Sequence, residues 1–281
     1  MKMIKELYPG VYVHSSHIQK MQSVILADER ALYVFDPCYF TSEIEEIREY
    51  SRGLETQERE RWLILTHSDW DHIAGVHDFA GYKIVVSNSW DEANESKMID
   101  KVEMFDSEFY VDRPWIGKMR RVPIDYRVTD GDSIAGLAFF EAKGHTGDGL
   151  VSIYGDIAIV GDYLSDVEFP FIFTSSRDYE RTLTKFQEMI EAFGIQTVIT
   201  QHGPAAVGPA EIQRRIKVSE DYIVRARAFV EEGIRKEWSI EQIVEAGRDF
   251  PYEGSPVAMG IRHFHDGNLR LIWKELMQAE E

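Results

Sequence analysis

Residues 61–75 read RWLILTHSDWDHIAG, and this is the stretch that decides the fold. Its apolar run from Trp62 to Leu65 predicts a short buried strand, because aromatic and branched residues favour strands. The run stops at Thr66, and four ligand-type residues follow within six positions: His67, Asp69, Asp71 and His72. Donors crowded in this way would each need a partner if buried, and a divalent metal ion supplies one partner for all of them.

Ligand-type residues also follow three later predicted strands. The strand at 137–143 runs into His145, the strand at 157–161 into Asp162, and the strand at 197–200 into His202. Residues just beyond strand ends lie on loops that project from a rigid base, which is a usual place for a site. We therefore expect all four segments to meet on one side of a sheet and to hold metal.

The remaining pattern predicts an α/β fold. Further strands are expected at 11–14, 23–27, 32–36, 83–87, 124–128 and 151–154. Helices are expected from a capping box at Ser42–Glu45 to Gly53, and at 89–102, 178–193, 209–233 and 263–279, with a short helix capped by Ser239. Two β-rich halves, each followed by helices, indicate two sheets face to face with helices outside. No linker divides the chain, so we expect one domain over 1–281 with C-terminal helices over 209–281.

Two stretches lack regular periodicity and are rich in aromatic residues, near 103–123 and 164–177. We interpret both as insertions. Their aromatic runs, Phe105 to Trp115 and Phe169 to Phe173, form either core beneath a long loop or the walls of an apolar pocket.

Composition excludes several classes of partner and location. The formal net charge of −18 predicts an acidic surface that repels polyanions, so nucleic acid is not expected as a partner. A single cysteine, Cys38, excludes an internal disulfide and is expected to be a small buried residue. There is no apolar signal segment and no run of eighteen apolar residues, which predicts a soluble, cytoplasmic protein without membrane association. The oligomeric state stays open, and a homodimer is one option.

Taken in order, these motifs resemble the metallo-β-lactamase superfamily of dinuclear metallohydrolases over nearly the whole chain. The resemblance implies a four-layer αββα sandwich, in agreement with the paired sheets predicted above. It also implies two metal ions, the first held by His67, Asp69 and His145, the second by Asp71, His72 and His202, with Asp162 bridging both. The family pattern usually reads His-x-His-x-Asp-His, so Asp69 stands where a histidine is expected.

The carboxylate at position 69 affects the choice of metal. Zinc is the first expectation from the family, but an additional hard oxygen ligand shifts the preference towards iron or manganese. Alternatively, Asp69 is a partner that orients His67 and does not touch metal.

The resemblance implies a hydrolytic mechanism. Two ions would share a water whose pKa falls from 15.7 towards about 7, and the resulting hydroxide would attack a carbonyl or a phosphorus. Asp71 would orient this hydroxide and carry its proton. Tyr163 would donate a hydrogen bond to the developing oxyanion, unless it serves only in packing. His263 and His265 either approach the pocket, as a C-terminal histidine does in some family members, or form a polar helix start. The remaining histidines that we singled out have no such context and are expected to be solvated: His14, His17 and His77.

We expect the substrate to be a small ester, thioester or lactone. Three alternatives stay open: hydrolysis of a small phosphodiester, a diiron redox protein, and a metal-binding module without turnover. The redox alternative is favoured by the carboxylate at position 69, because the flavodiiron branch of the family carries a glutamate there.

Overall fold

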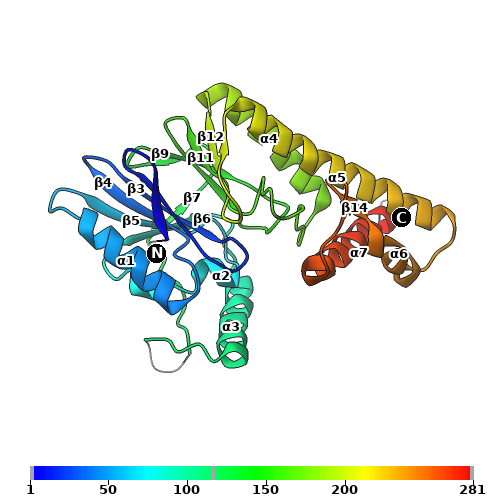
Figure 1. Ribbon diagram of the computed structural model, residues 1–281, viewed down its shortest axis with the longest axis horizontal. Coiled ribbons are helices and arrows are strands. Elements are labelled where there is room, and N and C mark those ends of the chain that lie inside the picture. The colour runs from blue at the N-terminus through cyan, green and yellow to red at the C-terminus, as the bar shows by residue number, and fades with distance from the viewer. Residues whose placement is uncertain (1–2, 115–117, 279–281) are drawn as a thin grey trace.

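The computed structural model describes residues 3–114 and 118–278, and two β-sheets packed face to face form its centre (Figure 1). The first sheet has seven strands whose spatial order follows the sequence: β1 (Ile4–Tyr8), β2 (Val11–Ser15), β3 (Gln22–Ala27), β4 (Ala31–Phe35), β5 (Glu60–Ile64), β6 (Lys83–Ser87) and β7 (Tyr126–Val128). The second sheet has the order β13-β12-β11-β10-β9-β8: β8 (Ser133–Ile134), β9 (Leu137–Glu141), β10 (Leu150–Tyr154), β11 (Ile157–Ile159), β12 (Thr197–Ile199) and β13 (Ala206–Val207). A small hairpin joins β14 (Pro251–Tyr252) to β15 (Ser255–Pro256).

Helices cover the outer faces of both sheets (Figure 1). On the first sheet lie α1 (Thr41–Leu54), α2 (Trp70–Ile73) and α3 (Glu92–Phe109), and on the second lie α4 (Ser176–Phe193) and the start of α5 (Pro209–Arg235). The rest of α5 extends beyond the sandwich, where α6 (Ile240–Ala246) and α7 (Arg262–Gln278) pack against it. The expected αββα architecture is confirmed. None of the helices in the described ranges has the length and apolar character needed to cross a bilayer.

Strand β4 shows why the central strands read as continuous apolar runs. Leu32 and Val34 belong to the core beneath α1 and α3, whereas Tyr33 and Phe35 belong to the core between the sheets. Successive side chains of a strand point to opposite faces, so a strand covered on both faces needs apolar residues at every position.

Strand direction brings the predicted site residues together. β9 and β11 are both antiparallel to β10, and β12 is parallel to β11, so the carboxyl ends of β9, β11 and β12 share one edge of the second sheet. The first sheet is hydrogen-bonded to this edge, because Leu150 N donates to Thr66 O over 2.7 Å and Gln22 N donates to Gln201 O over 2.6 Å. The site therefore lies where the two sheets meet.

Several predicted boundaries need correction. Strand β1 was not predicted. The capping box at Ser42 is wrong, because α1 begins at Thr41 after Phe40 and has no side-chain cap. Helix α3 begins at Glu92, where the Asp91 carboxylate accepts a hydrogen bond from Ala93 N. By contrast, the cap at Ser239 is confirmed as a capping box with Gln242.

The insertion predicted near 103–123 is wrong in its first part. Helix α3 continues to Phe109, and Phe105 is part of it, with its ring centroid 4.6 Å from that of Trp70. Trp115, which ends the predicted aromatic run, lies outside the described residues. The second insertion is a loop between Asp162 and α4, as expected.

His14 is not solvated, contrary to expectation. It is fully buried on β2, with Nδ1 3.6 Å from the sulfur of Cys38, and burial lowers its pKa to about 4. Its neighbour Cys38 is buried, as predicted. His77 is half-buried against the Arg120 carbonyl, so the expectation that it is solvated is also wrong. His17 is exposed, as expected.

Gly144 shows how tightly the loop that carries His145 is packed. Its φ is +124°, and a Cβ there would lie 2.3 Å from Tyr179 N in α4. We predict that Gly144→Ala lowers the free energy of unfolding by about 2 kcal/mol or more, through overpacking and backbone strain. Gly147→Ala in the same loop is the control, because nothing lies within 4 Å of a Cβ at that position. Denaturant unfolding of both variants measures the difference, and equal stabilities would contradict this packing.

Candidate metal centre

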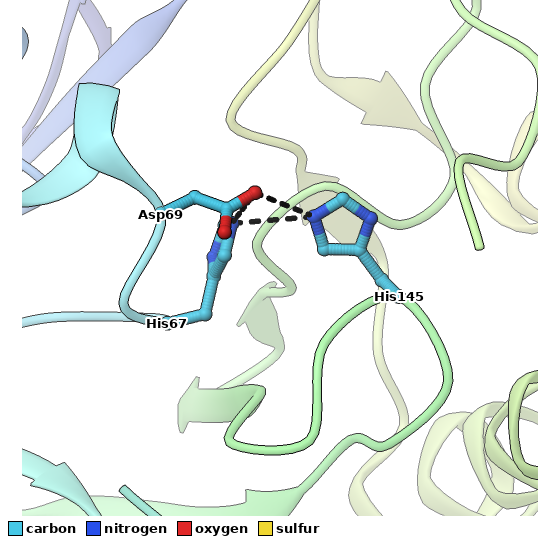
Figure 2. A group of neighbouring side chains, drawn as sticks. All are labelled: His67, Asp69 and His145. Carbon is cyan, nitrogen blue, oxygen red and sulfur yellow. Dashed lines mark hydrogen bonds and ion pairs between the residues drawn. The ribbon is translucent and has the colours of Figure 1, made fainter. Parts of the chain in front are cut away.

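The first group of donors comes from both sheets. His67 and Asp69 follow β5 and lie opposite His145, which sits on the loop after β9 (Figure 2). His145 Nε2 lies 3.3 Å from His67 Nε2 and 3.7 Å from Asp69 Oδ2. His67 Nε2 and Asp69 Oδ2 are 3.8 Å apart.

The second group contains Asp71, His72 and His202. His72 Nε2 lies 3.8 Å from Asp71 Oδ1, and His202 Nε2 lies 3.4 Å from Asp71 Oδ2. Helix α2 provides Asp71 and His72, whereas the loop after β12 provides His202. The two groups match the two ligand sets that the family resemblance implies.

Asp162 lies between the two groups. Its Oδ2 is 3.3 Å from His145 Nε2 and 3.5 Å from His202 Nε2, and its Oδ1 is 3.4 Å from His72 Nε2. A carboxylate that faces donors of both groups is placed as a bridging ligand would be.

All four histidines present the same nitrogen to the centre. Each Nδ1 faces an oxygen of the protein: Thr66 Oγ1 at 3.0 Å for His67, Asp36 Oδ2 at 3.0 Å for His72, the Phe171 carbonyl at 2.8 Å for His145, and the Gln19 carbonyl at 3.0 Å for His202. The hydrogen therefore belongs on Nδ1, and the Nε2 lone pair points inward. This arrangement is typical of histidine ligands to metals.

The donor set fits a pair of divalent ions. Within the described ranges, His72 Nε2 and Asp162 Oδ1 are buried without any hydrogen-bond partner. Donors arranged tetrahedrally at 2.0–2.2 Å from an ion stand about 3.3–3.6 Å apart, close to the distances observed here. Burial raises the pKa of Asp69 to about 6, so the cluster resists carrying its full negative charge without a cation.

The family profile of the Metallo-beta-lactamase superfamily matches residues 20–202, which include all seven of these donors. This chain belongs to the metallo-beta-lactamase superfamily. At the level of the family, it is therefore a metal-dependent hydrolase. No curated protein sequence matches it.

Solved structures share the fold of this superfamily member. They include the sec-alkylsulfatase Pisa1 from Pseudomonas sp., with a TM-score of 0.70 and 12% identity over 98% of this chain and 50% of that chain. The metallo-beta-lactamase family protein TTHA1429 from Thermus thermophilus aligns with a TM-score of 0.66 and 14% identity. The alignment covers 98% of this chain and 95% of that chain. The DIM-1 metallo-beta-lactamase aligns with a TM-score of 0.55 and 14% identity, over 78% of this chain and 96% of that chain. This chain thus spans half the length of the alkylsulfatase.

The sequence analysis did not identify Asp36, which holds two residues of the centre in place. Besides facing His72, its carboxylate accepts hydrogen bonds from Thr66 N over 2.9 Å and from Thr66 Oγ1 over 2.6 Å. Asp36 directly follows β4, which pairs in parallel with β5. The sequence did contain a signal for this residue: Asp36 is a carboxylate directly after an apolar run, as His67 is a donor shortly after the apolar run of β5.

Tyr163 does not have the role expected for it. It is buried, and its hydroxyl accepts a hydrogen bond from His145 N over 3.0 Å and donates one to the Lys143 carbonyl over 2.8 Å. The expectation that this hydroxyl would serve an oxyanion is therefore wrong. Tyr163 instead fixes the loop that carries His145.

The C-terminal histidines do not reach the centre either. His265 is fully buried beside Tyr222, whose hydroxyl lies 2.8 Å from His265 Nδ1, and burial lowers its pKa to about 4. His263 is exposed, and its ring lies 3.9 Å from that of Phe264. The residue of α7 that does approach the centre is Phe264, which lines the cavity next to the donors.

Asn268 of α7 holds the loop that orients His145. Its Oδ1 accepts a hydrogen bond from Ile172 N over 2.9 Å, and its Nδ2 donates to the Pro170 carbonyl over 2.6 Å. Phe171, between these two residues, provides the carbonyl that faces His145 Nδ1. The C-terminal helices thus help to position a proposed metal ligand.

We predict that Asp162→Ala loses most of the bound metal, because Asp162 faces donors of both groups. Metal content after gel filtration, measured by plasma mass spectrometry, tests this. Asp156→Ala, in the exposed turn between β10 and β11, is the control and should retain the wild-type content. Retention of both ions by Asp162→Ala would show that the bridge is misassigned.

We further predict that Asn268→Ala weakens metal binding about tenfold, because the loop whose Phe171 carbonyl orients His145 loses its support. It should also lower the free energy of unfolding by about 2 kcal/mol, since buried backbone groups lose their partners. Competition with a chelator and denaturant unfolding measure the two effects. Lys274→Ala, on an exposed position of the same helix, is the control. Unchanged metal affinity in Asn268→Ala would contradict the positioning role.

Proposed function

We propose that this protein hydrolyses a small ester, thioester or lactone at a pair of metal ions held by the seven donors. The observation that carries this proposal is a cavity of about 90 Å³ directly at the donors. Its walls include four aromatic residues from three elements: Trp70 of α2, Phe171 and Phe173 of the loop before α4, and Phe264 of α7. A small cavity whose walls are partly aromatic suits a compact acyl group better than a bare phosphate. A wider hollow of about 690 Å³ lies around Asp28 and Gly136, and none of the donors lines it.

We assign Asp69 as a metal ligand and not as an outer partner of His67. The Nδ1 of His67 already faces Thr66 Oγ1, whereas Asp69 Oδ2 lies near the Nε2 atoms of His67 and His145. Three carboxylates against two divalent ions leave +4 − 3 = +1. Zinc, iron and manganese all suit nitrogen and oxygen donors, and the added carboxylate favours iron or manganese relative to an all-histidine set.

Asp71 is the residue to which we assign proton transfer. Bound divalent ions act as Lewis acids and lower the pKa of water towards about 7. Asp71 lines the cavity, and its Oδ2 lies 3.4 Å from His202 Nε2. We infer that this carboxylate orients the attacking water and accepts its proton.

The proposal extends to cellular context. A location in the cytoplasm suits a chain whose single cysteine is buried and reduced. A small-molecule substrate suits the narrow cavity, and the net charge of −18 argues against nucleic acid.

We predict that Asp71→Asn lowers kcat/KM by about 100-fold or more, because general acid–base catalysis contributes that much. The protein is purified without added metal, and its metal content is measured. Its activity is then assayed on a panel of ester, thioester, lactone, phosphodiester and alkyl sulfate substrates. Asp156→Asn is the matched control. Turnover by Asp71→Asn at the wild-type rate per bound metal would reject the assignment.

The same assay separates the alternatives. Iron with an optical change that depends on O2 or NO would indicate redox chemistry, and preferential turnover of the phosphodiester would indicate a phosphodiesterase. A folded, fully metallated protein that turns over none of the panel would indicate a binding module.

A further inference from the structure

Lys101 is the one cationic side chain that lines the metal cavity within the described part of the chain. It lies on α3, on the side of the cavity formed by the first half of the protein. The other ionisable lining residues are the carboxylates and histidines of the metal centre and Glu168. Apart from any bound metal, Lys101 is therefore the positive group of this cavity that can attract an anionic part of a ligand.

Contacts on both sides of Lys101 hold α3 against Ser68 and Trp70, which adjoin the donors Asp69 and Asp71. Asn94, seven residues earlier, donates from Nδ2 to Ser68 Oγ over 2.8 Å. Phe105, four residues later, packs on Trp70 with ring centroids 4.6 Å apart. Residues at these spacings share one face of a helix. Helix α3 is therefore held against Ser68 before Lys101 and against Trp70 of α2 after it.

The ammonium of Lys101 has no internal partner. Among residues 3–114 and 118–278, it forms no hydrogen bond, ion pair or ring contact, although the chain has 49 acidic residues against 31 lysines and arginines. Lys118, which lies close to the same helix, is paired with Glu103 at 2.9 Å. Lys101 is exposed to solvent, and its position at the cavity makes its three N–H donors available to a ligand bound there.

We propose that Lys101 determines specificity by binding a carboxylate of the substrate. The substrate class is then a small ester or thioester with a free carboxylate away from the bond that is cleaved. This inference deepens the proposed hydrolytic function and rests on it. A carboxylate is a small oxyanion that fits a cavity of about 90 Å³, and a single ammonium neutralises its charge. The aromatic walls pack against the apolar part between the carboxylate and the reacting carbonyl.

The test compares two substrates that differ only in charge. These are the phenyl thioester of glutaric acid, which has a free carboxylate, and the same thioester with that carboxylate methylated. Lys101→Met should lower the ratio of their kcat/KM values, charged over neutral, by about tenfold, because a charge-assisted hydrogen bond is lost. The loss should appear mainly in KM, and Lys101→Arg should recover part of the ratio.

Lys97→Met is the matched control. It removes an exposed lysine one turn earlier on α3 that does not line the cavity, so the ratio should stay at the wild-type value. In the wild type, 1 M NaCl should reduce the ratio, because the screening length falls to about 3 Å. A ratio that is equal in the wild type and Lys101→Met would overturn the proposal.

A binding measurement separates failure of this inference from failure of the hydrolytic proposal. Calorimetric titration of the metal-loaded protein with monomethyl glutarate and with dimethyl glutarate requires no turnover. If neither thioester is hydrolysed, the proposed hydrolysis fails. Lys101 is still supported if Lys101→Met weakens binding of the monoanion about tenfold relative to the diester and Lys97→Met does not. Equal binding by the wild type and Lys101→Met would overturn it.

Discussion

Seven electron-pair donors converge on one small volume. Four Nε2 lone pairs face inward because each Nδ1–H is directed at an oxygen of the protein. Three aspartates, Asp69, Asp71 and Asp162, share the same space. Such an arrangement is repulsive without a cation, and burial makes the repulsion stronger. A bound cation would remove this repulsion, and the superfamily to which the chain belongs is metal-dependent.

The centre also joins the two halves of the sandwich. Each donor group combines residues that follow strands of the first sheet with a histidine that follows a strand of the second. Hydrogen bonds at Thr66–Leu150 and Gln22–Gln201 already connect the sheets at this edge. Metal binding is therefore coupled to the packing of one sheet on the other, as is usual where ligands come from distant segments.

The outer helices adapt this shared architecture to one pocket. Helix α7 provides Phe264 to the cavity wall and holds the Phe171 loop through Asn268, whereas α3 brings Lys101 to the opposite side. In the proposal made for Lys101, the aromatic side chains and the ammonium together bind a small, partly apolar anion. These features lie outside the metal ligands, so they give this member of the superfamily its own selectivity.

The sequence alone determined the sandwich and the donor segments. Strand β5 and the motif after it are local, and apolar runs that end on His145, Asp162 and His202 reveal strand ends without any knowledge of their neighbours. The tertiary structure alone decided the rest. Whether Tyr163 faces the pocket or the backbone, whether His265 or Phe264 reaches the cavity, and which residue supports His72 all depend on distant chain segments. Side-chain roles of this kind follow from contacts between residues far apart in sequence, whereas periodicity reports only which face of its own element a residue occupies.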